Sequence, residues 1–363
     1  MKKILFILGT RPEAIKMCPL IKELKERRGV EARLLVSGQH RALLDEVLSA
    51  FSVTPDYDLS LMKKGQTLTD LTVGVLEGVG RVIDEYRPVL AVVHGDTTTA
   101  MAAALACFYA RVPIAHVEAG LRTYDLFAPY PEELNRRVIS LLAAYSFAPT
   151  KAAKENLLSE GKAEKSVFVT GNTAIDALKF TVTTRYTHEV LDWARGGRLV
   201  LLTAHRRESH GEGLRSMLRG VRRVVEEIPD LFLIYPVHPN PAVRGVAKEC
   251  LSGAERIRLL PPLSVLDFHN LMARSYLILT DSGGIQEEAP ALHIPVLVMR
   301  SVTERPEGVK SGCLRLIGTD EESVYRGFRA LVCDPSEYKK MASAENPFGD
   351  GHACRRIADV LER

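Results

Sequence analysis

The chain has 363 residues, enough for two domains that each bury a sizeable apolar core. Charged residues make up 26% of the sequence with both signs interspersed, and the net charge of +3 argues against a nucleic-acid or membrane-surface protein. The six cysteines are scattered without a C-x-x-C pair, which indicates neither a disulfide framework nor a zinc ribbon and fits the reducing cytoplasm. Since no apolar run approaches the roughly 20 residues that span a bilayer, no membrane insertion is expected.

The first predicted element is a buried strand at residues 4–8, followed by a helix with Pro12 near its start. The apolar run imitates a signal peptide, but charged residues follow it and no cleavage-like small residues do. The turn lacks the glycines of dinucleotide sites and of P-loops, and it offers Arg11, Glu13 and Lys16 instead. The turn therefore raises the question of which ligand uses two cations and a carboxylate where backbone amides normally suffice.

Short apolar strands alternate with helical patterns along most of the chain, which predicts an α/β protein with parallel sheets covered by helices on both faces. The predicted strands are 3–8, 32–36, 89–94, 112–117, 145–148, 166–169, 198–203, 231–236, 256–259, 275–280 and 295–299, and the predicted helices include 67–86, 97–110, 132–143, 213–228 and 321–332. The rhythm breaks between about Asn172 and Gly197, so we expect two domains, 1–171 and 172–351. In such sheets ligands bind beyond the carboxyl ends of the strands.

Carboxylates follow two predicted strands of the first half. Asp96 either caps the next helix or serves a site, and the sequence leaves both alternatives open. Glu118 is placed by strand alternation on the same face as His116, and a carboxylate at a buried strand end needs a partner or a function. Glu132 and Glu133 begin a helix, and for Glu133 we favour the interpretation that it only complements the helix dipole.

The first strand of the second half is followed by the charged run "HRRES". A lone histidine is more often structural than catalytic, but His205 follows a buried strand at the predicted ligand-binding edge. The spacing of His205 and Glu208 invites a metal ion. No H-E-x-x-H helix or acidic cluster accompanies that spacing, so no metal is expected.

The stretch "DSGGIQEEAP" is the most specific element of the second half. Ser282, Gly283 and Gly284 open a helix, and the glycines allow a phosphate to approach exposed amides closely. Glu288 follows at a distance that suits hydrogen bonds from ribose hydroxyls, whereas the alternative is an ordinary glycine turn capped by Ser282. Arg305 follows another strand and suits a phosphate or a neighbouring carboxylate.

Ten motifs in order and spacing resemble the non-hydrolysing UDP-N-acetylglucosamine 2-epimerases, between Lys3 and Gly351: "GTRPEAIKM", "GQH", "HGDTTT", "HVEAGLRT", "PEELNR", "GNTAID", "HRRES", "YPVHPN", "LTDSGGIQEEAP" and "TERPE". The resemblance implies a GT-B fold, in which two Rossmann-like domains face a cleft and a C-terminal helix, 352–363, crosses back to the first domain. It also implies that a homodimer interconverts UDP-N-acetylglucosamine and UDP-N-acetylmannosamine for surface polysaccharide synthesis.

The resemblance also assigns residues. The catalytic positions that match are Asp96, Glu118, Glu132 and His205, and the nucleotide-binding positions are Arg11, Lys16, Ser282, Gly283, Gly284, Glu288 and Arg305. On this assignment Arg11 and Lys16 face a pyrophosphate, which answers the question raised by the first turn. Bacterial members bind a second UDP-N-acetylglucosamine as an allosteric activator, for which the matching positions are Gln39, His40, Gln66, Glu132, Arg206 and His238. Ala42 departs from that pattern, because many relatives have Gln or Glu there.

The chemistry limits the possible routes. The hydrogen on sugar C2 is not acidic, because no carbonyl activates it, and oxidation by a nicotinamide would need a glycine fingerprint that the chain lacks, so no cofactor is expected. Expulsion of UDP from C1 as the C2 proton leaves needs a base, an acid on the opposite face and cations for the departing UDP. The order of roles among Asp96, Glu118 and His205 stays open. The alternatives are a hydrolysing 2-epimerase, a GT-B glycosyltransferase and a UDP-sugar sensor.

Overall fold

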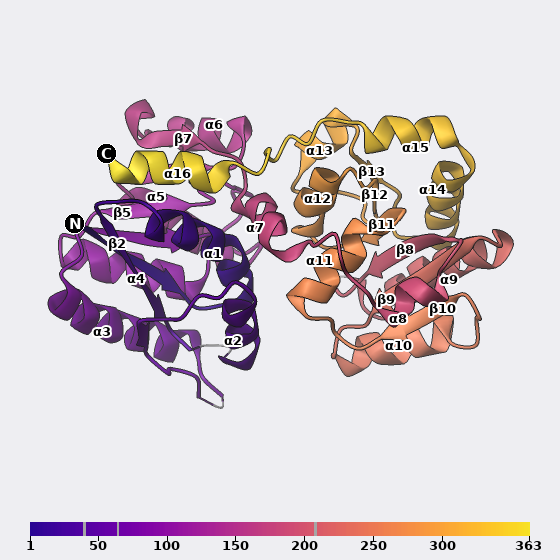
Figure 1. The fold of residues 1–363 in the computed structure, drawn as a ribbon, viewed down its shortest axis with the longest axis horizontal. Coiled ribbons are helices and arrows are strands. Elements are labelled where there is room, and N and C mark those ends of the chain that lie inside the picture. Colours follow the sequence, from indigo (N-terminus) through magenta and orange to yellow (C-terminus); the bar gives the residue numbers. More distant parts are fainter. Residues whose placement is uncertain (39–40, 64, 207–208) are drawn as a thin grey trace. The chain divides into compact units, whose positions relative to one another are not determined.

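The computed structural model describes residues 1–38, 41–63, 65–206 and 209–363, and it divides into two compact α/β units (Figure 1). The first unit comprises Met1–Phe180 and Phe348–Arg363, and the second comprises Thr181–Pro347. Each unit has one parallel sheet, as the sequence predicts. None of the helices within these four ranges has the length and apolarity to span a bilayer.

The sheet of the first unit has seven strands in the order β3-β2-β1-β4-β5-β6-β7. The strands are β1 (Lys2–Leu8), β2 (Val30–Val36), β3 (Tyr57–Asp58), β4 (Leu90–His94), β5 (Ile114–Val117), β6 (Tyr145–Ala148) and β7 (Val167–Val169). In the central register Ile4 of β1 pairs with Ala32 of β2 and with Leu90 of β4. β1 is covered on both faces, which explains why it is a continuous apolar run. The edge strand β3 was not predicted, because two residues show no periodicity.

Helices cover both faces of this sheet: α1 (Arg11–Lys25), α2 (Arg41–Ala50), α3 (Leu68–Tyr86), α4 (Thr98–Tyr109), α5 (Glu132–Leu142), α6 (Lys151–Ser159), α7 (Thr173–Thr181) and α16 (Ala353–Glu362), with a 3-10 turn η1 (Glu164–Ser166). The small side chains of α4 are almost all buried, so this helix packs closely against β4 and against α3. The core here combines β-branched residues of the strands with the alanines of α4.

The C-terminal helix α16 belongs to the first unit, where it packs against α1. Its start is held by Asp176 of α7, whose carboxylate accepts hydrogen bonds from the amides of Ala353 (3.1 Å) and Cys354 (3.0 Å). The units divide after Phe180 and not after residue 171, the boundary that the sequence suggested. The physical reason is that α7 packs on the first unit, with the Phe180 ring 6.0 Å from that of Phe51.

The second unit repeats the same winding with six strands in the order β10-β9-β8-β11-β12-β13. The strands are β8 (Arg198–Thr203), β9 (Leu231–Pro236), β10 (Ile257–Leu260), β11 (Leu277–Thr280), β12 (Val296–Val298) and β13 (Leu314–Leu316). The helices are α8 (Glu189–Trp193), α9 (Glu212–Glu227), α10 (Pro241–Leu251), α11 (Val265–Ala273), α12 (Ile285–Glu288), the 3-10 helix η3 (Ala289–Leu292), α13 (Pro306–Ser311), α14 (Glu321–Cys333) and α15 (Pro335–Ala342). Strand β13 is three residues long and was also missed.

Both sheets reverse their winding beside the central strand. The chain runs outward from β1 to β3 and then returns to β4 beside β1, and it runs from β8 to β10 and then returns to β11 beside β8. The carboxyl ends of the strands at such a switch point diverge and leave room for a ligand. The sites are therefore expected beyond β1 and β4 in the first unit and beyond β8 and β11 in the second.

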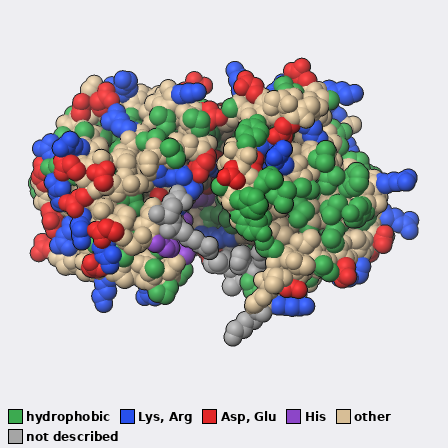
Figure 2. Space-filling view, turned by 180° about the vertical axis from the view of Figure 1, so that it is seen from behind, with side chains coloured by type: hydrophobic (Ala, Val, Ile, Leu, Met, Phe, Trp, Pro, Cys, Tyr) green, Lys and Arg blue, Asp and Glu red, His purple; other side chains and the backbone are tan. Residues whose placement is uncertain are grey.

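Exposed hydrophobic side chains gather on neighbouring helices of the first unit, and Figure 2 shows a broad hydrophobic area on that unit. The exposed residues on α3, α4 and α5 include Val73, Phe108, Tyr109, Leu134 and Leu141. Contiguous apolar areas of this kind are typical of interaction surfaces.

Candidate active site

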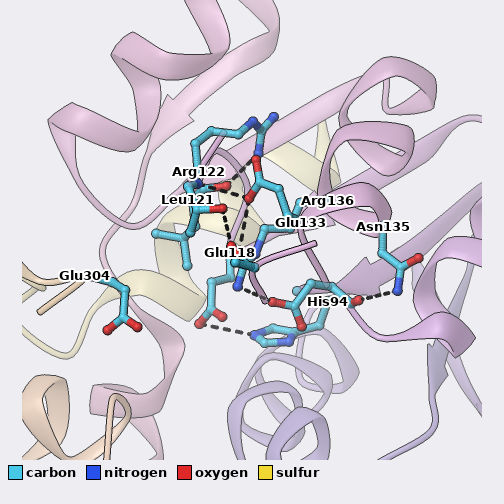
Figure 3. Close-up of polar contacts among 12 residues, drawn as sticks. His94, Glu118, Leu121, Arg122, Glu133, Asn135, Arg136 and Glu304 are labelled. Carbon is cyan, nitrogen blue, oxygen red and sulfur yellow. Dashed lines mark hydrogen bonds and ion pairs between the residues drawn. The ribbon is translucent and has the colours of Figure 1, made fainter. Parts of the chain in front are cut away.

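An ion pair between Lys16 and Glu118 lies at the switch point of the first sheet. Lys16 comes from the first turns of α1, Glu118 follows β5, and their side chains are only 14% and 11% exposed. The Glu118 carboxylate also faces the His94 ring at the end of β4, with 3.6 Å between Nε2 and Oε2 (Figure 3). The Asn172 side chain donates to the same Oε2 at 3.3 Å. The resemblance-based residues Lys16 and Glu118 are thus brought together.

The surroundings keep Glu118 ionised. Burial alone raises the pKa of its carboxyl, but the charges of Lys16 and His94 outweigh burial and hold that pKa well below its usual range. The residue therefore presents a fixed negative charge next to a cation.

Glu118 has an unusual backbone conformation with φ of 62°, which a non-glycine residue adopts at a cost. The predicted alternation with His116 therefore ends at Val117, where β5 ends. His116 stays in the strand, fully buried, with its Nε2 2.7 Å from the carbonyl of Gly95. Burial lowers the pKa of His116 to about 3, so its ring is neutral. A Cβ at Gly120 would lie 2.1 Å from the Ala153 carbonyl, so the turn after Glu118 requires glycine.

Asp96 is not the cap of the helix that follows β4. Thr97 is the N-cap of α4, and its hydroxyl accepts a hydrogen bond from the amide of Ala100 at 3.0 Å. The Asp96 carboxylate instead pairs with Arg136 of α5 at 2.6 Å, and its carbonyl accepts a hydrogen bond from the Asn135 side chain at 2.8 Å. The capping alternative is therefore wrong, and α5 holds Asp96 at the sheet edge.

The two glutamates at the start of α5 differ in their surroundings. The interpretation that Glu133 only complements the helix dipole is wrong, because Glu133 is fully buried and accepts hydrogen bonds from the amides of Thr123 (3.0 Å) and Tyr124 (3.1 Å). Figure 3 shows Glu133 next to Leu121 and Arg122 of the loop after β5. Glu132 has a buried Oε2 with no hydrogen-bond partner among the described residues. An unpaired buried carboxylate oxygen needs an explanation, such as a catalytic role or a hydrogen bond from water.

The first turn also separates its three charged residues. Glu13 is buried and accepts hydrogen bonds from the amides of Gly9 (3.1 Å) and Thr10 (2.8 Å) and from the Thr97 hydroxyl (2.9 Å). Its carboxylate therefore joins the turns after β1 and β4. Arg11 is the first residue of α1 and is half-buried.

In the second unit, the switch point is organised by Asp281, the residue after β11. Asp281 is 0% exposed, and its Oδ2 accepts hydrogen bonds from the amides of His205 (2.7 Å) and Arg206 (2.8 Å) after β8. The His205 ring is 41% exposed and stacks on the ring of His238, which follows β9, with centroids 5.4 Å apart. The strand ends thus place two histidines together at this edge.

The glycine turn after Asp281 approaches Arg305. Gly284 precedes α12, and the amide of Ser282 donates to the Thr280 hydroxyl at 2.9 Å. A Cβ at Gly283 would lie 2.8 Å from an Arg305 nitrogen, so a side chain at this position would displace the guanidinium that lies against the turn. The Arg305 Nε donates to Glu287 at 2.9 Å.

Glu288, the predicted ribose ligand, faces the buried His269 of α11. Their Nε2 and Oε2 atoms are 3.7 Å apart, and the His269 Nδ1 lies 2.7 Å from the Thr181 hydroxyl. His269 therefore lies between Glu288 and Thr181, the first residue of the second unit.

Part of the predicted second ligand site lies at the same edge. Arg206 contacts Glu304 at 3.3 Å, and Arg300 contacts the same carboxylate at 2.6 Å. Although burial opposes it, these guanidinium contacts lower the pKa of Glu304 to about 2. Gln66 belongs to the first unit, where its side chain donates to the Leu61 carbonyl at 2.8 Å. Gln39 and His40 lie outside the described residues.

Taken separately, the two edges suit different parts of one reaction. The first supplies carboxylates of fixed orientation beside a cation, which suits proton transfer at carbon, and the second supplies guanidinium groups and a glycine turn, which suit a diphosphate. In the described ranges, no three His, Cys, Asp or Glu side chains are arranged to hold a metal ion. Sequence reasoning missed Arg136, Asn172 and Asp281 as site residues, although all three lie in the quoted motifs "PEELNR", "GNTAID" and "DSGG".

Comparisons with known proteins agree in one family. The sequence model described as UDP-N-acetylglucosamine 2-epimerase matches residues 22–362. The Bacillus subtilis UDP-N-acetylglucosamine 2-epimerase is 51% identical over 359 residues, which cover 99% of this chain and 94% of that protein. The S. aureus MnaA structure with UDP has a TM-score of 0.93 at 49% identity and covers 100% of this chain and 96% of its own. The Neisseria meningitidis UDP-GlcNAc 2-epimerase bound to UDP-GlcNAc has a TM-score of 0.91 at 42% identity, with 99% of each chain covered.

Proposed function

The chain belongs to the UDP-N-acetylglucosamine 2-epimerase family, and from this premise we propose that it interconverts UDP-N-acetylglucosamine and UDP-N-acetylmannosamine without hydrolysis. The observation that carries the proposal is the buried ion pair of Glu118 with Lys16, beside an Asp96 that Arg136 orients. Two oriented carboxylates at one sheet edge suit a sugar carbon that must lose a proton from one face and gain it on the other.

The proposed route is elimination followed by re-addition. A carboxylate takes the proton from C2, the electrons of the C–H bond form the C1–C2 double bond, and the C1–O bond breaks with its electron pair going to the diphosphate of UDP. The products are UDP and 2-acetamidoglucal. Protonation of C2 from the opposite face, with attack of the diphosphate oxygen on C1, gives the epimer. All atoms and electrons balance without an oxidant or a cofactor.

In this scheme Asp96 and Glu118 exchange the C2 proton, with Glu132 beside them, and His205 assists the diphosphate or the sugar. In this scheme the position of Lys16 sets the pKa of the Glu118 carboxyl and hence its strength as a base. While Lys16 faces Glu118, the low pKa of the carboxyl makes it a weak base. When Lys16 turns to the diphosphate with Arg11, the carboxylate loses this stabilisation and becomes a better proton acceptor.

The second unit holds the nucleotide in the proposed scheme. The Ser282–Gly284 turn and Arg305 bind the diphosphate, and Glu288 accepts hydrogen bonds from the ribose. The support is the close approach that Gly283 permits and the guanidinium that lies against it.

The test is proton NMR of the purified protein with UDP-N-acetylglucosamine in deuterated water. We expect UDP-N-acetylmannosamine with deuterium at C2, together with deuterium washed into C2 of the substrate. Free N-acetylmannosamine plus UDP would instead identify a hydrolysing 2-epimerase. An unchanged spectrum at saturating substrate would favour a glycosyltransferase or a UDP-sugar sensor and would refute the proposal.

The activator and the assembly are further parts of the proposal. A second UDP-N-acetylglucosamine would use Arg206 and His238, and the test is whether conversion of pure UDP-N-acetylmannosamine starts only after traces of UDP-N-acetylglucosamine are added. A homodimer would cover the apolar area on α3, α4 and α5, which light scattering of the wild-type protein and a Leu141→Asp variant can test. The product would supply N-acetylmannosamine for surface polysaccharides made from cytoplasmic precursors.

A further inference from the structure

The two carboxylate oxygens of Asp281 have different surroundings. Oδ2 is saturated by the amides of His205 and Arg206, at 2.7 and 2.8 Å. Oδ1 is buried and has no hydrogen-bond partner among the described residues. An unpaired carboxylate oxygen at 0% exposure is costly, so it needs an explanation beyond holding the loop.

The free oxygen points toward the ring of His205. The distance from Oδ1 to the His205 Nδ1 is 3.8 Å, which is within ion-pair range and about 1 Å longer than a hydrogen bond. The His205 ring cannot tilt freely, because it stacks on the His238 ring at an interplanar angle of 12°. The backbone is also fixed, since the His210 Nε2 lies 3.2 Å from the His205 carbonyl. A movement of the ring by about 1 Å toward Oδ1 would bring the two atoms within hydrogen-bond distance.

We propose that Asp281 is the positioning residue of His205: it keeps the proton of the neutral imidazole on Nδ1 and leaves Nε2 free to exchange a proton with the bound ligand. The inference rests on the proposed function of His205 in the reaction. The logic is that of a histidine whose second nitrogen is oriented by a buried carboxylate. Asp281 contacts the backbone amides of His205 and Arg206 and faces the His205 ring, so in this proposal its effect on the reaction passes through the imidazole.

The charges around His205 explain why a buried carboxylate is needed there. His238 stacks on the ring, His210 lies against the backbone of the same loop, and Arg206 is the next residue. Burial, together with the neighbouring His205 and His210, lowers the pKa of His238. In the proposed arrangement the buried Asp281 carboxylate stabilises the imidazolium that forms when Nε2 accepts a proton.

The test is the tautomer of His205, read from long-range ¹H–¹⁵N NMR of the protein and assigned with a His205→Gln variant. In the wild-type protein we expect the proton on Nδ1. In an Asp281→Asn variant the amide oxygen must keep the two backbone N–H groups, so the amide nitrogen faces His205 as a donor, and we expect the proton to move to Nε2. With this change we expect kcat to fall about 10²-fold or more while KM changes little, because the wrong tautomer is presented.

An Nε2 proton in the wild-type protein, or an unchanged tautomer in Asp281→Asn, would overturn the proposal. The wild-type measurement decides even if the variant does not fold. The same experiments separate the proposed function from the proposed role of Asp281. If the wild-type protein never converts UDP-N-acetylglucosamine but has the Nδ1 tautomer, the proposed function is wrong and the positioning of His205 by Asp281 stands. A protein that epimerises with kcat unaffected by Asp281→Asn keeps its function and loses the inference.

Discussion

Removing Lys16 should show how strongly it stabilises the charge on Glu118. The two side chains are 14% and 11% exposed, so solvent screens the pair little. A Lys16→Met variant removes the cation from a carboxylate that Asn172 and His94 still contact, and a Glu118→Gln variant removes the negative charge that faces the Lys16 ammonium. Breaking one side of a largely buried pair costs about 3 kcal/mol or more, whereas the double variant removes both charges and should be destabilised less than either single variant.

The assay is calorimetric unfolding of the four proteins of this cycle. For a unit of this size, about 3 kcal/mol corresponds to a fall in Tm of roughly 6–12 °C for each single variant. The matched control is the exposed pair Lys154–Glu164, also in the first unit, whose side chains are 27% and 77% exposed. The corresponding Lys154→Met and Glu164→Gln cycle should give a coupling of only about 0.2–1 kcal/mol.

The pH dependence has a definite sign. Because the folded pKa of Glu118 is depressed, its contribution to stability is fully present above the ordinary value of 4.5 and is lost only as the pH falls through the depressed value. The wild-type protein and Lys16→Met should therefore differ at neutral pH and converge in strong acid. A coupling at neutral pH no larger than that of the exposed control would refute the reasoning.

Three further predictions follow from buried polar groups. Asp176→Ala leaves two helix amides of α16 unpaired and should lower the free energy of unfolding by about 2–5 kcal/mol. The control Asp334→Ala removes the same kind of cap from an exposed helix and should lower it by about 1 kcal/mol. Equal losses of the two variants in urea unfolding would contradict this prediction. The pKa of His116 is about 3 in the folded protein, so stability should fall as the pH drops from about 6.5 toward 3, by up to about 1.4 kcal/mol per pH unit relative to His116→Asn; parallel pH curves for the two proteins would show that the ring is not buried neutral. Arg136→Met should lower kcat about 10- to 100-fold by releasing Asp96, whereas the exposed neighbour Arg137→Met should leave kcat unchanged, and a loss in both variants would argue against a specific role for Arg136.

The sequence predicted most strands because a parallel sheet covered on both faces needs continuous apolar runs, as in β1 and β8. It missed β3 and β13, whose two and three residues carry no periodicity and are ordered by their neighbours in the sheet. The domain boundary was placed too early, because the pattern of α7 does not reveal that Asp176 and Phe180 contact distant parts of the first unit.

The site residues could be located at strand ends, but their partners could not. Nothing local distinguishes Glu133, which holds a loop, from Glu132, whose Oε2 has no hydrogen-bond partner in the described part of the chain, since both begin the same helix. Asp and Thr are both favourable N-cap residues, so the sequence does not show whether Asp96 or Thr97 caps α4. Thr97 is the cap because the Asp96 carboxylate pairs with Arg136, which lies on another helix. Such pairings join residues that are distant in the sequence, so motif spacing does not predict them.

The position of α16 has a consequence for how the protein is made. Residues 181–347 form a unit that is complete as soon as they have left the ribosome. The first unit then still lacks residues 348–363, which cover α1 and donate hydrogen bonds to Asp176. The half of the protein that is synthesised first is therefore finished last. Until then the apolar face of α1 that α16 covers remains open, so a nascent chain, or one truncated before α16, exposes it to chaperones and proteases.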